Sequence, residues 1–271
     1  MTRAADMTTK PGMLSPITWV GATGRRVIDL SGQVGNATMF LIRALSQLVR
    51  PPFRWGLLLE QVHFIGSRSL SIVMLTGAFT GLVLALQGYN ALSRFGAQQM
   101  VGALVALSLT RELAPVLAAL MVTARAGSAI AATLGNMRVT EQIDALETMA
   151  IDPLSYLVVP RVIASVFVAP MLTALFTLTG LAVAEALCVG VLGQDRAQFA
   201  SSVRSAIEWS DVVEGLSKAL TFSVLMCWIA SYRGYHASGG AQGVGQATTR
   251  AVVETSVLVL AVDYILTALL F

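Results

Sequence analysis

The sequence is poor in charge. Only 12% of its 271 residues are Asp, Glu, Lys or Arg, against about 25% in an ordinary soluble domain. The hydrophobic fraction is 55% and the mean hydropathy is +0.72. These values predict an integral membrane protein. The net charge of +3 is dispersed along the chain, and no basic stripe alternates with aromatic residues, which argues against nucleic-acid binding.

Lysine is scarcer still, and its scarcity restricts the chemistry. The two lysines are Lys10, followed by Pro11, and Lys218, followed by Ala219. A phosphate-binding loop for ATP ends in Lys-Ser or Lys-Thr, so the chain has no such loop. We therefore expect any ATP and magnesium to be bound by a partner.

Metal ligands and catalytic nucleophiles are missing as well. His63 and His236 are far apart in sequence and belong to no metal-ligand cluster, and a Gly-x-Ser-x-Gly motif does not occur. Cys188 and Cys227 lie inside apolar runs, where a thiol behaves as a small hydrophobic group. We expect no catalytic residue, metal or cofactor, and hence a protein that is not an enzyme.

Apolar runs long enough to cross a bilayer dominate the rest of the chain. A helical span needs about 20 apolar residues, and five runs qualify: 68–89, 100–123, about 157–192, 214–232 and 250–271. The third is longer than one span requires. We favour a single helix bent at Pro170 over two short re-entrant pieces, because no polar turn divides the run. The predicted fold is an all-α membrane protein with five transmembrane helices.

The distribution of arginine and lysine predicts the orientation. With the N-terminus in the cytoplasm, twelve of these residues fall inside and three fall outside. The inside set is Arg3, Lys10, Arg25, Arg26, Arg43, Arg50, Arg54, Arg125, Arg138, Arg161, Arg233 and Arg250; the outside set is Arg94, Arg196 and Arg204. The C-terminus is then predicted on the periplasmic side.

The N-terminal part, residues 1–61, is predicted to be cytoplasmic and to carry an amphipathic helix. Its apolar positions recur at helical spacing, and two prolines end it. These positions are Leu41, Ala44, Leu45, Leu48 and Val49, followed by Pro51 and Pro52. The helix could lie on the inner leaflet or pack on the protein's own loops. Residues 62–271 form the predicted membrane domain.

Several charges fall inside the predicted spans. Arg111 and Glu112 precede Pro115, which cannot donate to the Arg111 carbonyl. A rise of about 1.5 Å per residue puts Glu112 about 18 Å, Asp263 about 12 Å and Lys218 about 6 Å from the outer ends of their spans. Shared depth favours a cavity open to the outside over isolated structural pairs. Glu185 also falls toward the outer side.

A small-residue motif and an acidic segment complete the pattern. Gly77 and Gly81 let helices approach closely, either between two copies or within one chain.

Residues 137–150 predict one short amphipathic helix. Its apolar stripe consists of Val139, Ile143, Leu146 and Ala150, and its acidic edge consists of Glu141, Asp144 and Glu147. The acidic edge is either a solvated face or a docking surface for a soluble partner.

Several long motifs together resemble the MlaE (YrbE-type) permeases of ABC lipid transporters. They are LQGY (86–89), LVALSLTRELAPVLAALMVTARAGSAIAA (104–132), MRVTEQIDALETMAIDPL (137–154), VPR (159–161) and ATTRAVVETSVLVLAVDYILTALLF (247–271). The resemblance runs from about residue 63 to the C-terminus.

The resemblance implies an assembly and a cargo. It implies a homodimer in the bacterial inner membrane, bound to cytoplasmic ABC ATPase subunits, a periplasmic MCE-domain protein and a small cytoplasmic STAS-type subunit. Phospholipid would move between the inner membrane and a periplasmic carrier, which maintains outer-membrane lipid asymmetry.

The resemblance also implies site residues. A lipid pocket would be lined by Leu84, Gln87, Leu92, Phe95, Arg111, Glu112 and Leu113, with Lys218 and Asp263 at charged family positions. A coupling helix at about 136–152 would contact the ATPase through Arg138, Glu141, Gln142, Asp144 and Glu147.

Two other functions remain open from sequence. An ion- or proton-coupled secondary carrier would use Glu112 and Asp263 as a relay. A membrane scaffold would use its charges only to bind other subunits.

Overall fold

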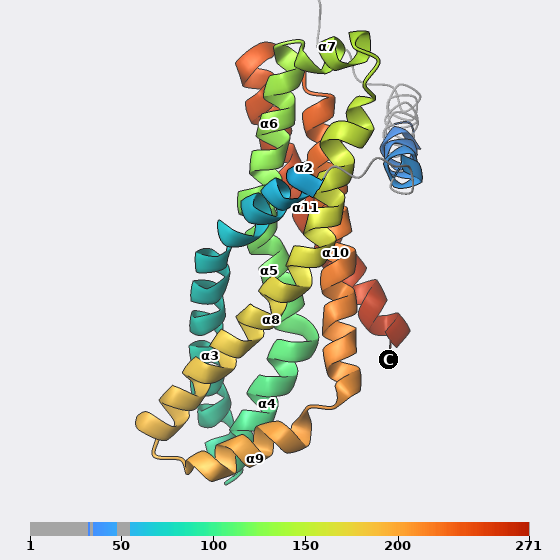
Figure 1. Ribbon diagram of the computed structural model, residues 1–271. Coiled ribbons are helices and arrows are strands. Elements are labelled where there is room, and N and C mark those ends of the chain that lie inside the picture. The colour runs from blue at the N-terminus through green and yellow to red at the C-terminus, as the bar shows by residue number, and fades with distance from the viewer. Residues whose placement is uncertain (1–31, 33–34, 48–54, 271) are drawn as a thin grey trace, which may run out of the picture. The chain divides into compact units, whose positions relative to one another are not determined.

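The computed structural model describes residue 32, residues 35–47 and residues 55–270. Residues 1–42 and 43–271 form two separate compact units, and the account below concerns the second. Within the described part of this unit all regular structure is helical (Figure 1). Its elements are α2 (Trp55–Val62), η1 (His63–Ser67), α3 (Leu70–Ser93), η2 (Gln98–Met100), α4 (Val101–Ser108), η3 (Leu109–Leu113), α5 (Ala114–Val122), η4 (Thr123–Gly127), α6 (Ser128–Val139), α7 (Gln142–Thr148), η5 (Leu154–Val158), α8 (Val159–Gly190), α9 (Arg196–Ala206), α10 (Trp209–Tyr235) and α11 (Gly240–Leu270).

Five helical segments are long and apolar enough to cross a membrane, which confirms the predicted fold class. They are Trp55–Ser93, Gln98–Val139, Leu154–Gly190, Trp209–Tyr235 and Gly240–Leu269. The second has 42 residues and, at about 1.5 Å per residue, is about 63 Å long. A hydrocarbon core is only about 30 Å thick. The helices therefore continue outside the membrane, which is why the apolar runs underestimated their lengths.

The third predicted run is one continuous helix. α8 extends over 32 residues with Pro170 inside it, as favoured from sequence. It crosses α3 at two glycines. A Cβ on Gly77 would lie 2.7 Å from the Phe176 carbonyl oxygen, and one on Gly81 would lie 2.1 Å from the Gly180 carbonyl oxygen. The small-residue motif thus serves packing within the chain.

The acidic segment predicted as one helix over 137–150 is interrupted, so the predicted bounds of this helix were wrong. α6 ends at Val139, and Glu141 has a φ of 58°, a left-handed conformation that interrupts a right-handed helix. The separate helix α7 covers only Gln142–Thr148 and lies across the end of the bundle opposite α9 (Figure 1). Of the predicted apolar stripe, Ile143 is fully buried, whereas Val139 and Ala150 are exposed.

The predicted N-terminal amphipathic helix is described only in part. Residues 35–47 are helical, with Ala44 buried and Leu45 exposed. Leu48, Val49, Pro51 and Pro52 lie outside the described residues. The sequence analysis missed α2, a second short helix that directly precedes the first apolar span.

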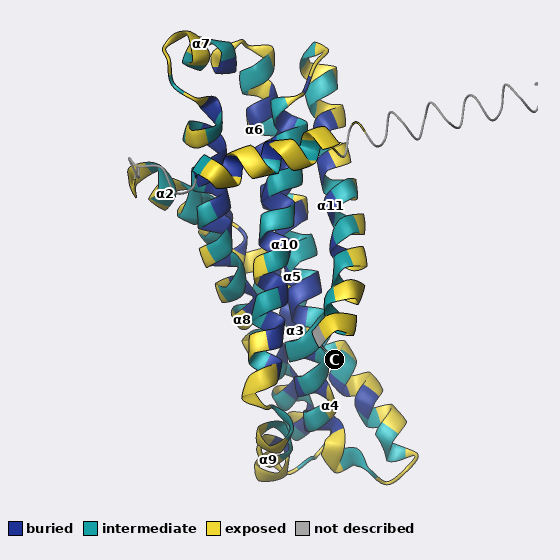
Figure 2. Cartoon of the chain, turned by 90° about the vertical axis from the view of Figure 1, so that its right-hand side faces the viewer, coloured by how far each residue is buried: buried dark blue, intermediate teal, exposed yellow. Residues whose placement is uncertain are grey.

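Many residues along the outer helices are exposed (Figure 2), and large apolar side chains are among them. On α3 they recur at spacings of three and four residues, which places them on one face. They are Ile72, Leu75, Phe79, Val83 and Leu86. An exposed apolar stripe of this length on a membrane-spanning helix faces lipid or another protein.

The glycine crossing predicts opposite effects of two alanine substitutions. Gly81→Ala pushes a methyl group into the α8 backbone, so we expect a loss of about 1–3 kcal/mol of stability. Gly190→Ala, at a helical glycine with open space around it, should be neutral or stabilising by up to about 1 kcal/mol. Denaturation by SDS in mixed micelles measures both. Equal stability of the two variants would contradict the close crossing.

Candidate functional site

The candidate site starts at a local irregularity of the second span. Residues Leu109–Leu113 form the π-helical turn η3. It ends two residues before Pro115, whose ring nitrogen has no hydrogen to donate. The Arg111 carbonyl that Pro115 would otherwise bond accepts a hydrogen bond from Lys218 Nζ at 3.1 Å. The sequence predicts that the Arg111 carbonyl lacks its helical hydrogen-bond donor, and in the structure this carbonyl makes a contact between two spans.

Lys218 is the centre of the site. Its side chain is 0% exposed, and its Nζ lies 2.8 Å from Glu112 Oε1, 3.2 Å from Glu214 Oε1 and 3.8 Å from Asp263 Oδ1. Nζ also donates to Thr267 Oγ1 at 2.9 Å. An ammonium group removed from water needs such compensation, because an unpaired buried charge is very costly.

Arg111 is the second cation of the site. Its Nε lies 2.8 Å from Asp211 Oδ1 and 3.6 Å from Glu214 Oε2. Asp211 is itself fixed, because its other oxygen accepts the backbone N–H of Glu208 at 2.8 Å in the capping box of α10. Glu214 bridges Arg111 and Lys218, so the six charged side chains form one ionic cluster: Arg111, Glu112, Asp211, Glu214, Lys218 and Asp263.

A close helix crossing brings the cluster together. A Cβ on Gly215 would lie 2.3 Å from the Thr110 carbonyl oxygen, so only glycine lets α10 approach η3 so closely. Asp211, Glu214 and Lys218 occupy positions i, i+3 and i+7 of α10 and therefore share one helix face. This spacing is visible in the sequence and could have identified Asp211 and Glu214, which the sequence analysis missed.

The structure corrects the depths estimated from the apolar runs. Glu112, Lys218 and Asp263 lie at one level, although their estimated depths differed. The main reason is that α10 begins at Trp209 and not at residue 214, so Lys218 lies about 14 Å along its helix. Glu185 does not join the cluster; it pairs with the exposed Arg196 at 2.8 Å.

Of the other predicted lipid-binding residues, Leu113 directly follows Glu112 in η3, and the rest lie on α3 or just after it. Leu84 and Leu92 on α3 and Leu113 in η3 are partly buried, Gln87 is exposed, and Phe95 is 83% exposed. Within the described residues, no hydrogen bond or ion pair connects them with the ionic cluster. Gln87 and Phe95 are therefore accessible to lipid or to another protein, and the three leucines are accessible only in part.

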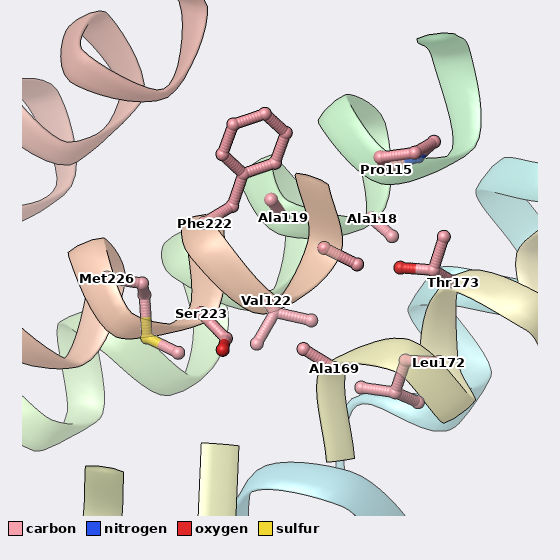
Figure 3. A pocket seen from close by; sticks show the side chains of 11 residues that line it. Pro115, Ala118, Ala119, Val122, Ala169, Leu172, Thr173, Phe222, Ser223 and Met226 are labelled. Carbon is pink, nitrogen blue, oxygen red and sulfur yellow. The ribbon is translucent and has the colours of Figure 1, made fainter. Parts of the chain in front are cut away.

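A small apolar cavity lies between α5, α8 and α10 (Figure 3). Phe222 and Met226 of α10, Leu172 of α8 and Val122 of α5 are among its lining residues. Its volume of about 20 Å³ has room for about one water molecule. An acyl chain does not fit into it without movement of the helices.

At the opposite end, the predicted coupling residues divide into two groups. Asp144 pairs with Arg138 at 2.5 Å, and Glu147 accepts a hydrogen bond from the Tyr235 hydroxyl at 3.2 Å. These contacts connect α7 with α6 and α10. Glu141 and Gln142 are exposed, and no ion pair or hydrogen bond of their side chains is found among the described residues.

The fold and the ionic cluster define a class: a polytopic α-helical membrane protein with charged side chains gathered inside its bundle. Comparison with known proteins then shows the family. The model of the family "Permease MlaE" matches residues 58–269, so the chain belongs to the MlaE permease family.

Curated relatives match over nearly the whole chain. The "Intermembrane phospholipid transport system permease protein MlaE" of Haemophilus influenzae is 42% identical over 94% of this chain and 98% of its own length. A "Probable ABC transporter permease protein" of Rickettsia felis is 43% identical over 92% of this chain and 96% of its own length. The chloroplastic "Protein TRIGALACTOSYLDIACYLGLYCEROL 1" of Arabidopsis thaliana is 34% identical over 83% of this chain and 64% of its own length. The chain is therefore a membrane permease subunit of an ABC transporter, and such a system has further components.

Removing the central cation should strongly destabilise the bundle. Lys218→Met leaves three carboxylates without their shared ammonium, and we expect a loss of about 3–5 kcal/mol. Arg196→Met, which breaks the exposed pair with Glu185, should cost at most about 1 kcal/mol. SDS denaturation of both variants measures the difference. The double variant Lys218→Met with Glu214→Gln should recover part of the stability lost in Lys218→Met. Similar stability of the two single variants and the double variant would contradict the central role of Lys218.

Proposed function

We propose that this permease moves phospholipids between the bacterial inner membrane and a periplasmic carrier, with ATP hydrolysed by a partner subunit, and so helps to maintain outer-membrane lipid asymmetry. The observation that carries the proposal is the ionic cluster inside an otherwise apolar bundle. The printed name of the Haemophilus influenzae relative, an intermembrane phospholipid transport system permease, supports the same cargo.

The exposure of the cluster suits a zwitterionic or anionic head group. Lys218 is fully buried, whereas Arg111 is 31% exposed and Glu112 is 37% exposed. The two accessible charges therefore have opposite signs. In our proposal Arg111, held by Asp211 and Glu214, attracts the lipid phosphate. Glu112, held by Lys218, can bind a head-group ammonium, and Asp263 pairs with Lys218.

The acyl chains need an apolar route. Each buried methylene contributes about 0.8 kcal/mol, so removing a lipid with some thirty methylenes from the bilayer costs on the order of 20 kcal/mol. The exposed apolar positions along α3 and at Phe95 offer such a surface, and we propose Leu84, Gln87, Leu92 and Leu113 as further lipid contacts. The cavity beside the cluster is too small for a chain, so lipid would enter when the helices separate or between two subunits.

The partners follow from what the chain lacks and what it exposes. With no phosphate-binding loop of its own, the permease would take its energy from cytoplasmic ABC ATPase subunits, which bind the ATP and magnesium. We propose that α7 docks on these subunits through Glu141 and Gln142. Asp144 and Glu147, held by Arg138 and Tyr235, would pass the movement to α6 and α10. A homodimer, a periplasmic MCE-domain protein and a small STAS-type subunit complete the proposed assembly.

The proposed orientation has the N-terminus in the cytoplasm and the C-terminus in the periplasm. It rests on the excess of arginine on one side of the spans. In this orientation α7 faces the cytoplasm and α9 faces the periplasm, and Phe95, which follows α3, lies on the periplasmic side.

Reconstitution tests the proposed transport. Liposomes that contain the permease and its ATPase should transfer fluorescent phospholipid to the periplasmic carrier only when ATP is hydrolysed. Phe95→Asp should slow the transfer, because the charge opposes contact with acyl chains, whereas Val191→Asp, at another exposed apolar residue, should not. Transfer by the permease alone without nucleotide would indicate a secondary carrier. ATPase binding without any lipid bound or moved would indicate a scaffold.

Charge reversal tests the docking helix. Glu141 is exposed and makes no ion pair in the described structure, so Glu141→Lys should leave the fold intact. It should weaken ATPase binding about tenfold, the scale of one lost charge contact. Glu185→Lys gives the same charge change on α8 far from α7 and serves as the control. Co-purification yields and binding by surface plasmon resonance measure the effect; unchanged affinity of Glu141→Lys would refute this docking surface.

A further inference from the structure

A second group of charges lies at the corner between α2 and α3, where one aromatic ring contacts two guanidinium groups. The Arg125 guanidinium carbon lies 4.9 Å from the centroid of the Phe64 ring, and that of Arg68 lies 5.7 Å from the same centroid. Both distances fall within the range of cation–π contacts. Both positive charges thus lie at one ring, and Arg68 interacts electrostatically with Arg125.

The two arginines differ in their contacts and in their exposure. Arg125, in η4, donates hydrogen bonds to the Phe64 carbonyl and, at 3.3 Å, to Ser69 Oγ, and it is partly buried. It therefore fixes the corner to the second span. Arg68 is exposed, and no hydrogen bond of its side chain is found in the described structure. It is available to a ligand.

Acidic partners are missing from this corner. None of the described carboxylates forms an ion pair with Arg68 or Arg125, whereas the ionic cluster around Lys218 has four carboxylates for two cations. The nearest acidic residue in sequence, Glu60, interacts electrostatically with the buried Arg161 of α8. Two guanidinium groups that share one ring and have no carboxylate partner attract an anion, and phosphate suits their planar donors.

The length of α3 places the corner at the level of lipid head groups. α3 has 24 residues and is about 36 Å long, close to the thickness of a hydrocarbon core of about 30 Å. Arg68 lies just before its first residue. Beyond this level α6, α10 and α11 continue toward α7 (Figure 1), and they expose polar residues there, among them Asn136, Thr249 and Arg250.

An apolar surface begins directly below the two arginines. Leu70, Ile72 and Leu75 are exposed on the first turns of α3, so acyl chains can lie along this helix while a head group meets Arg68. Arg125 is 14 positions from Arg111 in the continuous segment Gln98–Val139, which corresponds to about 21 Å. The corner is therefore a different place from the ionic cluster.

We infer that Arg68 and Arg125, which both contact the Phe64 ring, bind the head-group phosphate of an anionic phospholipid. The acyl chains of this lipid lie along the exposed face of α3. In the proposed orientation this lipid belongs to the cytoplasmic leaflet. It is a resident lipid that stabilises the α2–α3 corner, and its binding does not depend on lipid transport.

Lipid retention measures this binding directly. The purified full-length protein in detergent micelles is titrated with dioleoylphosphatidylglycerol or dioleoylphosphatidylcholine, and bound lipids are counted by native mass spectrometry. The wild type should retain the anionic phosphatidylglycerol in preference to the zwitterionic phosphatidylcholine. Arg68→Gln should lower its affinity for phosphatidylglycerol about fivefold, the effect of one arginine near an anionic lipid surface, and Arg68→Lys should keep most of it.

Arg250→Gln is the matched control, because it removes an exposed arginine from the same side of the membrane. It should leave retention unchanged, and thermal unfolding of all variants shows that the fold is intact. Equal phosphatidylglycerol retention by Arg68→Gln and the wild type would overturn the site, as would equal losses in Arg68→Gln and Arg250→Gln. Inorganic phosphate that displaces phosphatidylglycerol at submillimolar concentration would assign the site to a soluble anion and overturn the lipid assignment.

Discussion

The bundle depends on one fully buried ammonium group. Lys218 connects three spans, because its Nζ contacts Glu112 and the Arg111 carbonyl on the second, Glu214 on its own helix, and Asp263 and Thr267 on the last. Such an arrangement is costly to desolvate and is strongly destabilised when one partner is lost. It fixes the relative position of helices whose apolar surfaces alone would allow sliding.

Three backbone features make this arrangement possible. Pro115 frees the Arg111 carbonyl, the π-helical turn η3 displaces the chain before it, and Gly215 permits α10 to come against Thr110. The same helical segments continue to α7, where the Tyr235–Glu147 and Arg138–Asp144 contacts hold this proposed docking helix. α10 therefore connects a cytoplasmic surface with the ionic cluster in the proposed mechanism.

Much of this architecture was predictable, and the errors have identifiable causes. Five spans, a continuous third helix through Pro170 and a special carbonyl at Arg111 followed from run length and from proline chemistry. The prediction of one continuous acidic helix was wrong because periodicity cannot reveal that Glu141 adopts a left-handed conformation. Asp211 and Glu214 were missed because they lie before, or at the first residue of, the apolar run. The lipid-contact and coupling roles stay predictions.

The sequence by itself determined the membrane class, the number of spans, the absence of an ATP-binding loop and the family, because hydropathy, residue identity and motifs are local properties of the chain. Only the tertiary structure decided which charges meet. Residues 107 positions apart, Arg111 and Lys218, become neighbours through a glycine crossing, and Arg68 reaches the ring that Arg125 also contacts. Such pairings depend on helix orientation and depth, which are set by packing between spans and are not encoded in any one segment.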